Sequence, residues 1–269
     1  MLVPGLRPRQ PTGPGTPRPP PRRSAAGQNG GAEAVVRITT VFPGQDSNVF
    51  GYRRHHGITR TPGGWGPIPQ DKRGSVNIVV SNVKGGVGKT TSSVYLAAAA
   101  VDRGWDPVLL IDADRQASSA EWLEESPIEG VTLVEAPSER TVARALAGNE
   151  GFAVVDTPPG DERIVRAALD RADAVVIPTR AGGVEYSRVV ATLDMIGDGT
   201  PYGVVITAAR LGTRDLDEAV RWWTDSKVPI WGIVPERVGI AAGPEARLYR
   251  EGLDEYDAVL KKAIRKRPG

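Results

Sequence analysis

Short apolar runs alternate with stretches of helical spacing along the chain from residue 75 onward. Seven runs rich in Val and Ile predict strands, at 76–80, 108–111, 131–134, 152–155, 174–177, 202–206 and 228–234. The stretches between them predict helices, at 90–103, 117–125, 139–147, 162–171, 184–196 and 213–226. Apolar strands that alternate with helices form parallel βαβ units with both sheet faces covered. The pattern therefore predicts an α/β fold with a doubly wound, mostly parallel sheet.

A further helix is predicted near the end of the chain. Its apolar residues are three or four positions apart and form one stripe: Tyr249, Leu253, Tyr256, Leu260 and Ile264. Basic residues lie beside the stripe: Lys261, Lys262, Arg265, Lys266 and Arg267. Three interpretations are open, namely a core-packing helix with a basic end, a non-specific DNA contact, and a membrane-surface helix. Membrane binding is the least favoured of these, because the stripe is needed to cover the sheet.

The first 73 residues differ in composition from the rest. They hold 12 of the 23 prolines and 12 of the 32 glycines, with few large apolar side chains. Proline removes an amide donor and disfavours helix. The few apolar side chains bury too little surface to offset the conformational entropy that is lost when the segment becomes ordered. We predict a disordered arm over 1–73, with at most a transient strand at 34–42, and an α/β domain over 74–269.

The net charge of +2 is the sum of two parts of the chain that carry opposite net charges. Residues 1–73 carry 11 Lys and Arg against 3 Asp and Glu, a net of +8, while residues 74–269 carry 23 against 29, a net of −6. Two interpretations of the basic arm stand side by side, a tether that contacts DNA or another acidic surface and a solvated linker.

Two absences restrict the possible chemistry. The chain has no cysteine, which excludes disulfide scaffolds, thiolate zinc sites, iron–sulfur clusters and cysteine nucleophiles. It also has no apolar run near the roughly 18 residues of a membrane-spanning helix.

A glycine-rich loop follows the first predicted strand and opens the next helix. The loop reads SNVKGGVGKTT over 81–91, and its glycines, Gly85, Gly86 and Gly88, allow backbone amides to surround phosphate oxygens at a helix N-terminus. Lys89 is expected at the β and γ phosphates, and the Thr90 hydroxyl at Mg²⁺. The predicted nucleotide-binding residues are Lys84, Gly85, Gly86, Val87, Gly88, Lys89, Thr90 and Thr91. The usual glycine at the first position of such loops is replaced here by Asn82 or Val83, depending on register.

Carboxylates end two of the predicted strands. Asp156 follows the run FAVV and is expected to hold Mg²⁺, through water, as Mg²⁺ retains much of its hydration shell. Asp112 and Asp114 follow the run VLLI, and we expect the two to have different roles.

These motifs resemble those of the ParA/MinD family of P-loop ATPases. The loop KGGVGKTT is similar to the deviant Walker A motif, residues 112–116 to the D-x-D-P-Q element, and Asp156-Thr157-Pro158-Pro159 to the Walker B strand with its switch. The resemblance implies that Lys84 reaches the partner's phosphates in an ATP-bound dimer. It also implies that Asp114 orients the attacking water, that Asp112 lies near the metal with Thr90 and Asp156, and that Lys84, Lys89 and Asp114 carry catalysis. By a weaker similarity, residues 232–237 lie near the adenine, which adds Pro235 and Arg237 to the nucleotide-binding residues.

Two departures from the family pattern affect partner contacts more than nucleotide binding. Arg115 replaces the usual proline, and residues 180–183 stand where relatives carry a Pro-Ser-Pro stretch. Arg115 and Arg180 are candidate arginine fingers.

The resemblance implies a small ParA-type partitioning ATPase. It would use ATP and Mg²⁺, form a homodimer on ATP, bind DNA non-specifically, and hydrolyse ATP slowly until a ParB-like centromere-binding partner stimulates release. The expected location is cytoplasmic and nucleoid-associated, without membrane binding, and the expected DNA contacts are Lys261, Lys262, Arg265, Lys266 and Arg267. The alternative is a MinD-like ATP switch that positions membrane or secretion machinery.

Overall fold

The structure is a computed structural model that describes residues 37–40, 74–241, 243 and 250–265. All of them lie within the unit Ala34–Gly269. Among the helices of this part of the chain, none combines the length and apolar character needed to cross a membrane.

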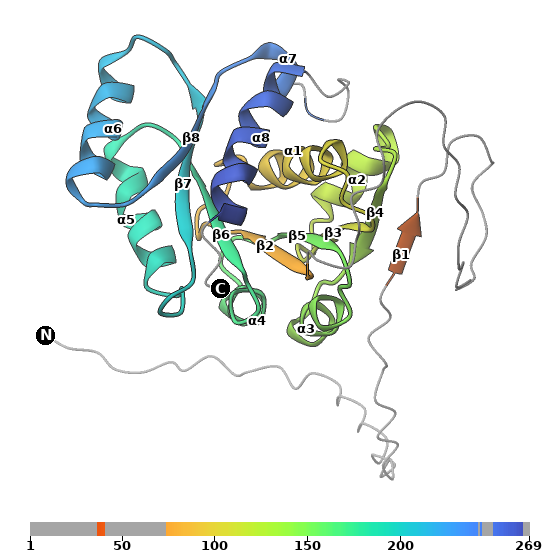
Figure 1. The fold of residues 1–269 in the computed structure, drawn as a ribbon. Helices are drawn as coiled ribbons and strands as arrows, with labels where there is room; N and C mark the ends of the chain where they lie inside the picture. The colour runs from red at the N-terminus through yellow and green to blue at the C-terminus, as the bar shows by residue number, and fades with distance from the viewer. Residues whose placement is uncertain (1–36, 41–73, 242, 244–249, 266–269) are drawn as a thin grey trace, which may run out of the picture. The chain divides into compact units, whose positions relative to one another are not determined.

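Seven parallel strands form the centre of the molecule, in the order β4-β3-β5-β2-β6-β7-β8 (Figure 1). Their bounds are β2 Val76–Val80, β3 Val108–Asp112, β4 Val131–Glu135, β5 Phe152–Asp156, β6 Ala174–Thr179, β7 Tyr202–Ala209 and β8 Ile230–Pro235. Each matches a predicted strand within three residues. The predicted α/β fold is confirmed, because these strands are parallel and helices pack on both faces of the sheet.

An eighth strand comes from the N-terminal arm. β1 (Arg37–Thr40) pairs antiparallel with β4 along the edge of the sheet, with Arg37 opposite Glu135 and Thr40 opposite Thr132. These four residues lie inside the predicted transient strand at 34–42, and they belong to the sheet and not to a separate disordered arm. The rest of 1–73 lies outside the described residues.

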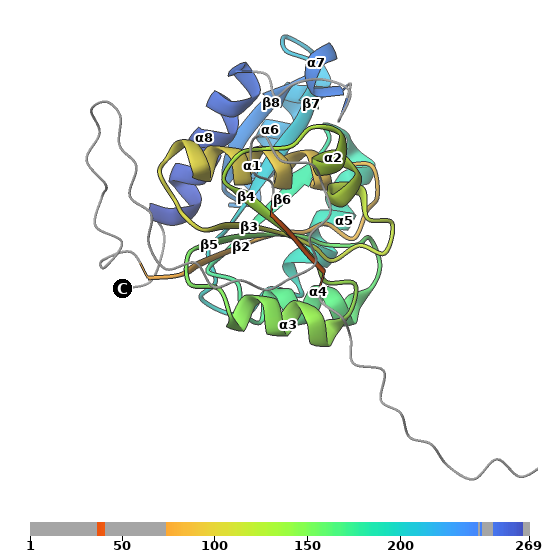
Figure 2. The same ribbon diagram turned by 90° about the vertical axis from the view of Figure 1, so that its right-hand side faces the viewer.

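One face of the sheet is covered by α1 (Lys89–Asp102), α2 (Ser118–Glu125) and α8 (Arg250–Arg265), which lie together above the strands in Figures 1 and 2. The alanine run of α1 is buried, and its small side chains let α8 pack closely against it. Tyr256 of α8 stacks on Tyr95 of α1, with ring centroids 5.4 Å apart. Tyr256 and Leu260 are buried, so the core-packing interpretation of the last helix is correct for this stripe, while Tyr249 lies outside the described residues.

The other face is covered by α3 (Glu139–Ala147), α4 (Glu162–Leu169), α5 (Gly183–Leu193) and α6 (Arg214–Asp225). Side-chain caps fix where three of these helices begin, through Ser138, Asp161 and Thr213. A short helix, α7 (Val238–Ala241), follows β8.

The helices after β2 and β5 lie on opposite faces of the sheet, α1 on one and α4 on the other. Ligands of open α/β sheets bind outside the carboxyl ends of the strands where the winding reverses. The fold therefore brings the ends of β2, β3 and β5 to one place, which is where the predicted phosphate loop and acids lie.

Candidate functional site

The phosphate loop connects β2 to α1. Gly86 and Gly88 have φ values of 71° and 88°, which glycine adopts without strain. A Cβ on Gly88 would also lie 3.5 Å from the side chain of Thr207. Helix α1 begins at Lys89, directly after the second of these turns. The loop thus ends at a helix N-terminus whose first amides are free to bind an anion.

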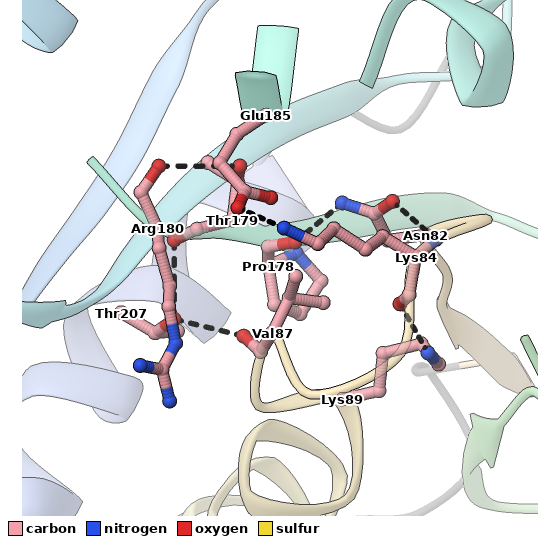
Figure 3. A network of polar contacts seen from close by, with 9 residues as sticks. All are labelled: Asn82, Lys84, Val87, Lys89, Pro178, Thr179, Arg180, Glu185 and Thr207. Atoms are coloured by element: carbon pink, nitrogen blue, oxygen red, sulfur yellow. Dashed lines mark hydrogen bonds and ion pairs between the residues drawn. The ribbon is translucent and has the colours of Figure 1, made fainter. Parts of the chain in front are cut away.

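Polar side chains fix the loop to β6 and β7 (Figure 3). The Asn82 amide donates to the Pro178 carbonyl at 2.8 Å, and its oxygen accepts the Lys84 amide at 2.9 Å. The Thr207 hydroxyl lies 2.8 Å from the Val87 carbonyl and 3.1 Å from the Thr179 carbonyl. Asn82 and Thr207 are buried, so these bonds hold the loop in place before any ligand binds.

Lys89 lies at the centre of the site. Its ammonium donates to the Lys84 carbonyl at 2.8 Å, and 7% of the residue is exposed. Burial lowers the pKa of Lys89, and the nearby carboxylates of Asp156 and Asp114 oppose that shift. A buried ammonium with a neutral carbonyl as its hydrogen-bond acceptor is well suited to accept a stronger, anionic partner such as a phosphate.

Asp156 lies at the end of β5 and is buried. Its Oδ2 accepts the Ser119 hydroxyl at 2.7 Å. Burial raises its pKa, and the nearby hydroxyls of Ser119 and Thr90 oppose that shift. Among the described residues, its Oδ1 has no hydrogen-bond partner although it is buried. A buried carboxylate oxygen beside a threonine hydroxyl at a phosphate loop fits Mg²⁺, which takes oxygen ligands.

No group of three or more His, Cys, Asp or Glu residues in the described part of the chain could hold a metal by itself. A Mg²⁺ site of the P-loop type takes most of its ligands from nucleotide phosphates and water. Thr90 and Asp156 would hold the ion here.

Asp112 ends β3 directly opposite Asp156 in the sheet register. Its carboxylate accepts three backbone amides, from Asp114, Ser119 and Ala120, each at 3.0 Å. Burial, with Asp156 nearby, raises the pKa of Asp112 to about 7. Asp112 therefore lies next to the expected metal ligand, and its observed contacts shape the loop that leads into α2.

Asp114 lies on that loop and is partly exposed. Its Oδ1 accepts the Gln116 amide at 3.0 Å, and its charge affects both Lys89 and Asp156. The structure thus brings Lys89, Asp156 and Asp114 close together. The neighbouring Arg115 is exposed, as is Arg180.

Lys84 extends away from Lys89, toward α5. Its ammonium forms an ion pair with Oε1 of Glu185 (Figure 3). No local sequence pattern indicates Glu185, because its partner Lys84 lies 101 positions away. Ser119 was also missed, since a serine in the first turn of a helix is usually a cap.

The remaining predicted residues lie further along the chain. Pro235 ends β8, and Arg237 donates to Glu255 of α8 at 2.9 Å. On α8, Lys261 pairs with Asp257 at 2.8 Å, Lys262 donates to the Ile230 carbonyl at 3.4 Å, and Arg265 is exposed. Lys266 and Arg267 lie outside the described residues.

Residues 78–248 match the family described as the CobQ/CobB/MinD/ParA nucleotide binding domain. The chain belongs to this family. It is 36% identical over 148 residues to "Maintenance of carboxysome distribution protein A" of Gloeobacter kilaueensis, covering 53% of this chain and 67% of that protein. It is 27% identical over 213 residues to "Chromosome-partitioning ATPase Soj" of Thermus thermophilus, covering 62% of this chain and 84% of that protein.

Solved structures share the fold at lower sequence identity. A putative plasmid partition protein from Borrelia burgdorferi bound to AMPPNP superposes with a TM-score of 0.60 at 19% identity, over 72% of this chain and all of that chain. The septum site-determining protein MinD from Pyrococcus horikoshii, complexed with Mg-ADP, gives 0.55 at 17% identity, over 70% of this chain and 95% of that chain. The resemblance to ParA/MinD-type proteins is thus confirmed, and with it a nucleotide-binding domain.

Proposed function

We propose that this protein is an ATP-switched, Mg²⁺-dependent ATPase that dimerises on ATP, binds DNA non-specifically and thereby segregates a DNA cargo. One observation carries the proposal. Two lysines stand on a single phosphate loop, and the ammonium of Lys89 lies among the carboxylates of the site while that of Lys84 is directed to α5. If Lys89 binds the phosphates of its own subunit, Lys84 is available to bind the phosphates of a second copy.

Each group of residues in the site has a different role in ATP hydrolysis. The amides of 85–91 and the ammonium of Lys89 bind the phosphates, and Thr90 and Asp156 hold Mg²⁺. When bound, Mg²⁺ neutralises charge that develops on the phosphate oxygens. Asp114 orients the attacking water, and Asp112 fixes the position of the loop of Asp114 by accepting the Asp114 amide and two amides in the first turn of α2.

In this proposal Lys84 acts on the ATP of a second copy. An ammonium delivered across the dimer neutralises phosphate charge that one subunit leaves uncompensated, so ATP favours the dimer. Hydrolysis removes the γ-phosphate, and with it the negative charge that holds Lys84 at the second copy, so the dimer dissociates. A ParB-like partner would accelerate the hydrolysis.

DNA binding would come from basic side chains that the fold leaves in solvent. Arg265 is exposed at the end of α8, next to Lys261 and Lys262. The arm adds Arg7, Arg9, Arg18, Arg22 and Arg23 before β1. Such charges bind phosphates of any sequence by releasing counterions, so the binding should weaken steeply with salt.

A second candidate is an ATP switch that positions a protein assembly. The 36% identity to a carboxysome distribution protein favours it over a membrane role. Membrane attachment through the stripe of α8 is disfavoured, because Tyr256, Val259 and Leu260 are buried against the domain.

Co-sedimentation tests the proposal. We expect the protein to pellet with plain duplex DNA in ATP and not in ADP, and not to pellet with anionic liposomes in either nucleotide. A variant that lacks residues 1–33 keeps β1 and the edge of the sheet, and should hydrolyse ATP normally while its DNA affinity falls by about tenfold at low salt. ATP-dependent liposome binding without DNA binding would contradict the DNA-segregation proposal. Unchanged DNA affinity of the shortened protein would show that residues 1–33 do not bind DNA.

A further inference from the structure

Glu185 lies in the first turn of α5 and has no role in the hydrolysis described above. Its Oε1 accepts the ammonium of Lys84, and its side chain is 10% exposed against 38% for Lys84. Its other oxygen, Oε2, is buried and has no hydrogen-bond partner among the described residues. One nearly buried carboxylate therefore depends on a single, more exposed ammonium (Figure 3).

Helix α5 contacts the same stretch of the loop at a second point. The Val83 amide donates to the Thr192 hydroxyl at 3.2 Å, and that buried hydroxyl donates to the Arg188 carbonyl at 2.9 Å. Glu185 and Thr192 are seven residues apart and so lie on one face of the helix, two turns from each other. The helix thus binds both residues that precede the paired glycines.

The contacts oppose any movement of Lys84 away from its own subunit. If its ammonium leaves, Glu185 loses the ion pair, and a buried carboxylate without a partner is unfavourable. A triphosphate carries more negative charge than one carboxylate, so it attracts the ammonium more strongly once it is within reach.

We propose that Glu185 is a positioning residue that holds Lys84 on its own subunit until the triphosphate of a second copy draws it away. The pair sets the ATP and protein concentration at which dimers form, and keeps subunits apart when no nucleotide is bound. This inference rests on the proposed function, because it requires Lys84 to act across a dimer.

The size of the effect follows from the exposure of the pair. A partly exposed ion pair such as this one contributes roughly a factor of three to an equilibrium. A symmetric dimer breaks two such pairs, so removing the carboxylates should tighten dimerisation by about tenfold.

The test uses the full chain with Asp114→Ala, a background in which bound ATP persists, and measures the dimer dissociation constant by sedimentation equilibrium in ATP and Mg²⁺. We expect Glu185→Gln to lower this constant about tenfold and Glu185→Asp, which keeps the charge on a shorter side chain, to lower it less. Asp194→Asn removes one exposed charge at the end of the same helix and should change nothing. Melting temperatures of the nucleotide-free proteins show that each variant is folded.

A double-mutant cycle separates this role from a structural one. Lys84→Ala should abolish ATP-dependent dimers, and Lys84→Ala with Glu185→Gln should behave like Lys84→Ala alone, since Glu185 acts only through Lys84. Unchanged or weaker dimerisation of both Glu185→Gln and Glu185→Asp would overturn the inference and leave the proposed function standing. If the Asp114→Ala protein forms no dimers in ATP, the proposed function fails and this inference fails with it.

Discussion

The two sides of the phosphate loop are built differently. On the side of β3, β5 and α2, the carboxylates of Asp112 and Asp156 are buried, and that of Asp112 accepts three backbone amides. On the side of β6 and α5, a half-exposed lysine makes one ion pair with Glu185. A carboxylate held by several backbone hydrogen bonds has one arrangement, whereas a lysine held by a single, partly exposed ion pair can exchange that partner for another.

This difference separates two tasks. The carboxylate side is preorganised, which suits a metal and an attacking water that must be placed accurately. The lysine side is switchable, which suits contact with a second copy. Mutations on the two sides should therefore affect different steps, hydrolysis on one and dimerisation on the other.

Lys89 lies between the two sides, and its loss should have the largest effect. We expect Lys89→Ala to weaken ATP binding by about 100-fold or more, because a charge-assisted contact to phosphate is lost. Fluorescent-nucleotide titration measures this. The nucleotide-free protein should melt no lower than the wild type, since a buried ammonium is removed, and Lys262→Ala should bind ATP normally. Wild-type affinity in Lys89→Ala would contradict the phosphate assignment.

Asp114 tests the carboxylate side alone. Asp114→Ala should lower the ATP turnover rate by about 100-fold or more, the usual contribution of a positioned acid or base, while ATP-dependent dimers remain. Steady-state phosphate release and sedimentation of the same sample measure the two properties. Normal turnover would show that another group orients the water, and loss of ATP-dependent dimers would contradict the proposed function.

Asp112→Asn tests how the buried carboxylates affect the pH dependence of protein stability. Its pKa in the folded protein is about 7, above the unfolded value near 4. Stability from this group is therefore fully present below about pH 4 and is lost as the pH rises through 7, a change of roughly 2–4 kcal/mol in the free energy of unfolding. We expect Asp112→Asn to reduce this slope by about half, since the pKa of Asp156 is also raised.

Urea unfolding at pH 5, 6, 7 and 8, without nucleotide or Mg²⁺, measures this slope. A matched control is Asp161→Asn, which changes an acid that caps α4 at the surface of the other face. An Asp112→Asn protein with the full wild-type slope would show that Asp112 is charged throughout this range.

Most of the fold and the centre of the site were predictable from local sequence. Apolar runs with the right lengths gave every parallel strand, because a strand covered on both faces must be apolar throughout. The phosphate loop and Asp156 were predictable because their function needs a strand, a glycine turn and a helix in that order. The strand Arg37–Thr40 was harder to predict from local sequence, because it pairs with β4, which is distant in the chain.

What the sequence alone determined is the order of βα units, the glycine-rich loop between the first strand of the domain and its helix, and the types of side chain around that loop. The tertiary structure decided which of these side chains face one another. It placed Glu185 against Lys84 from 101 positions away, and Ser119 against Asp156 from 37. Such contacts depend on how helices pack across a sheet, and no local spacing encodes them. The sequence thus specified the residues of the candidate nucleotide site, and the packing of α5 and α2 specified how these residues are held.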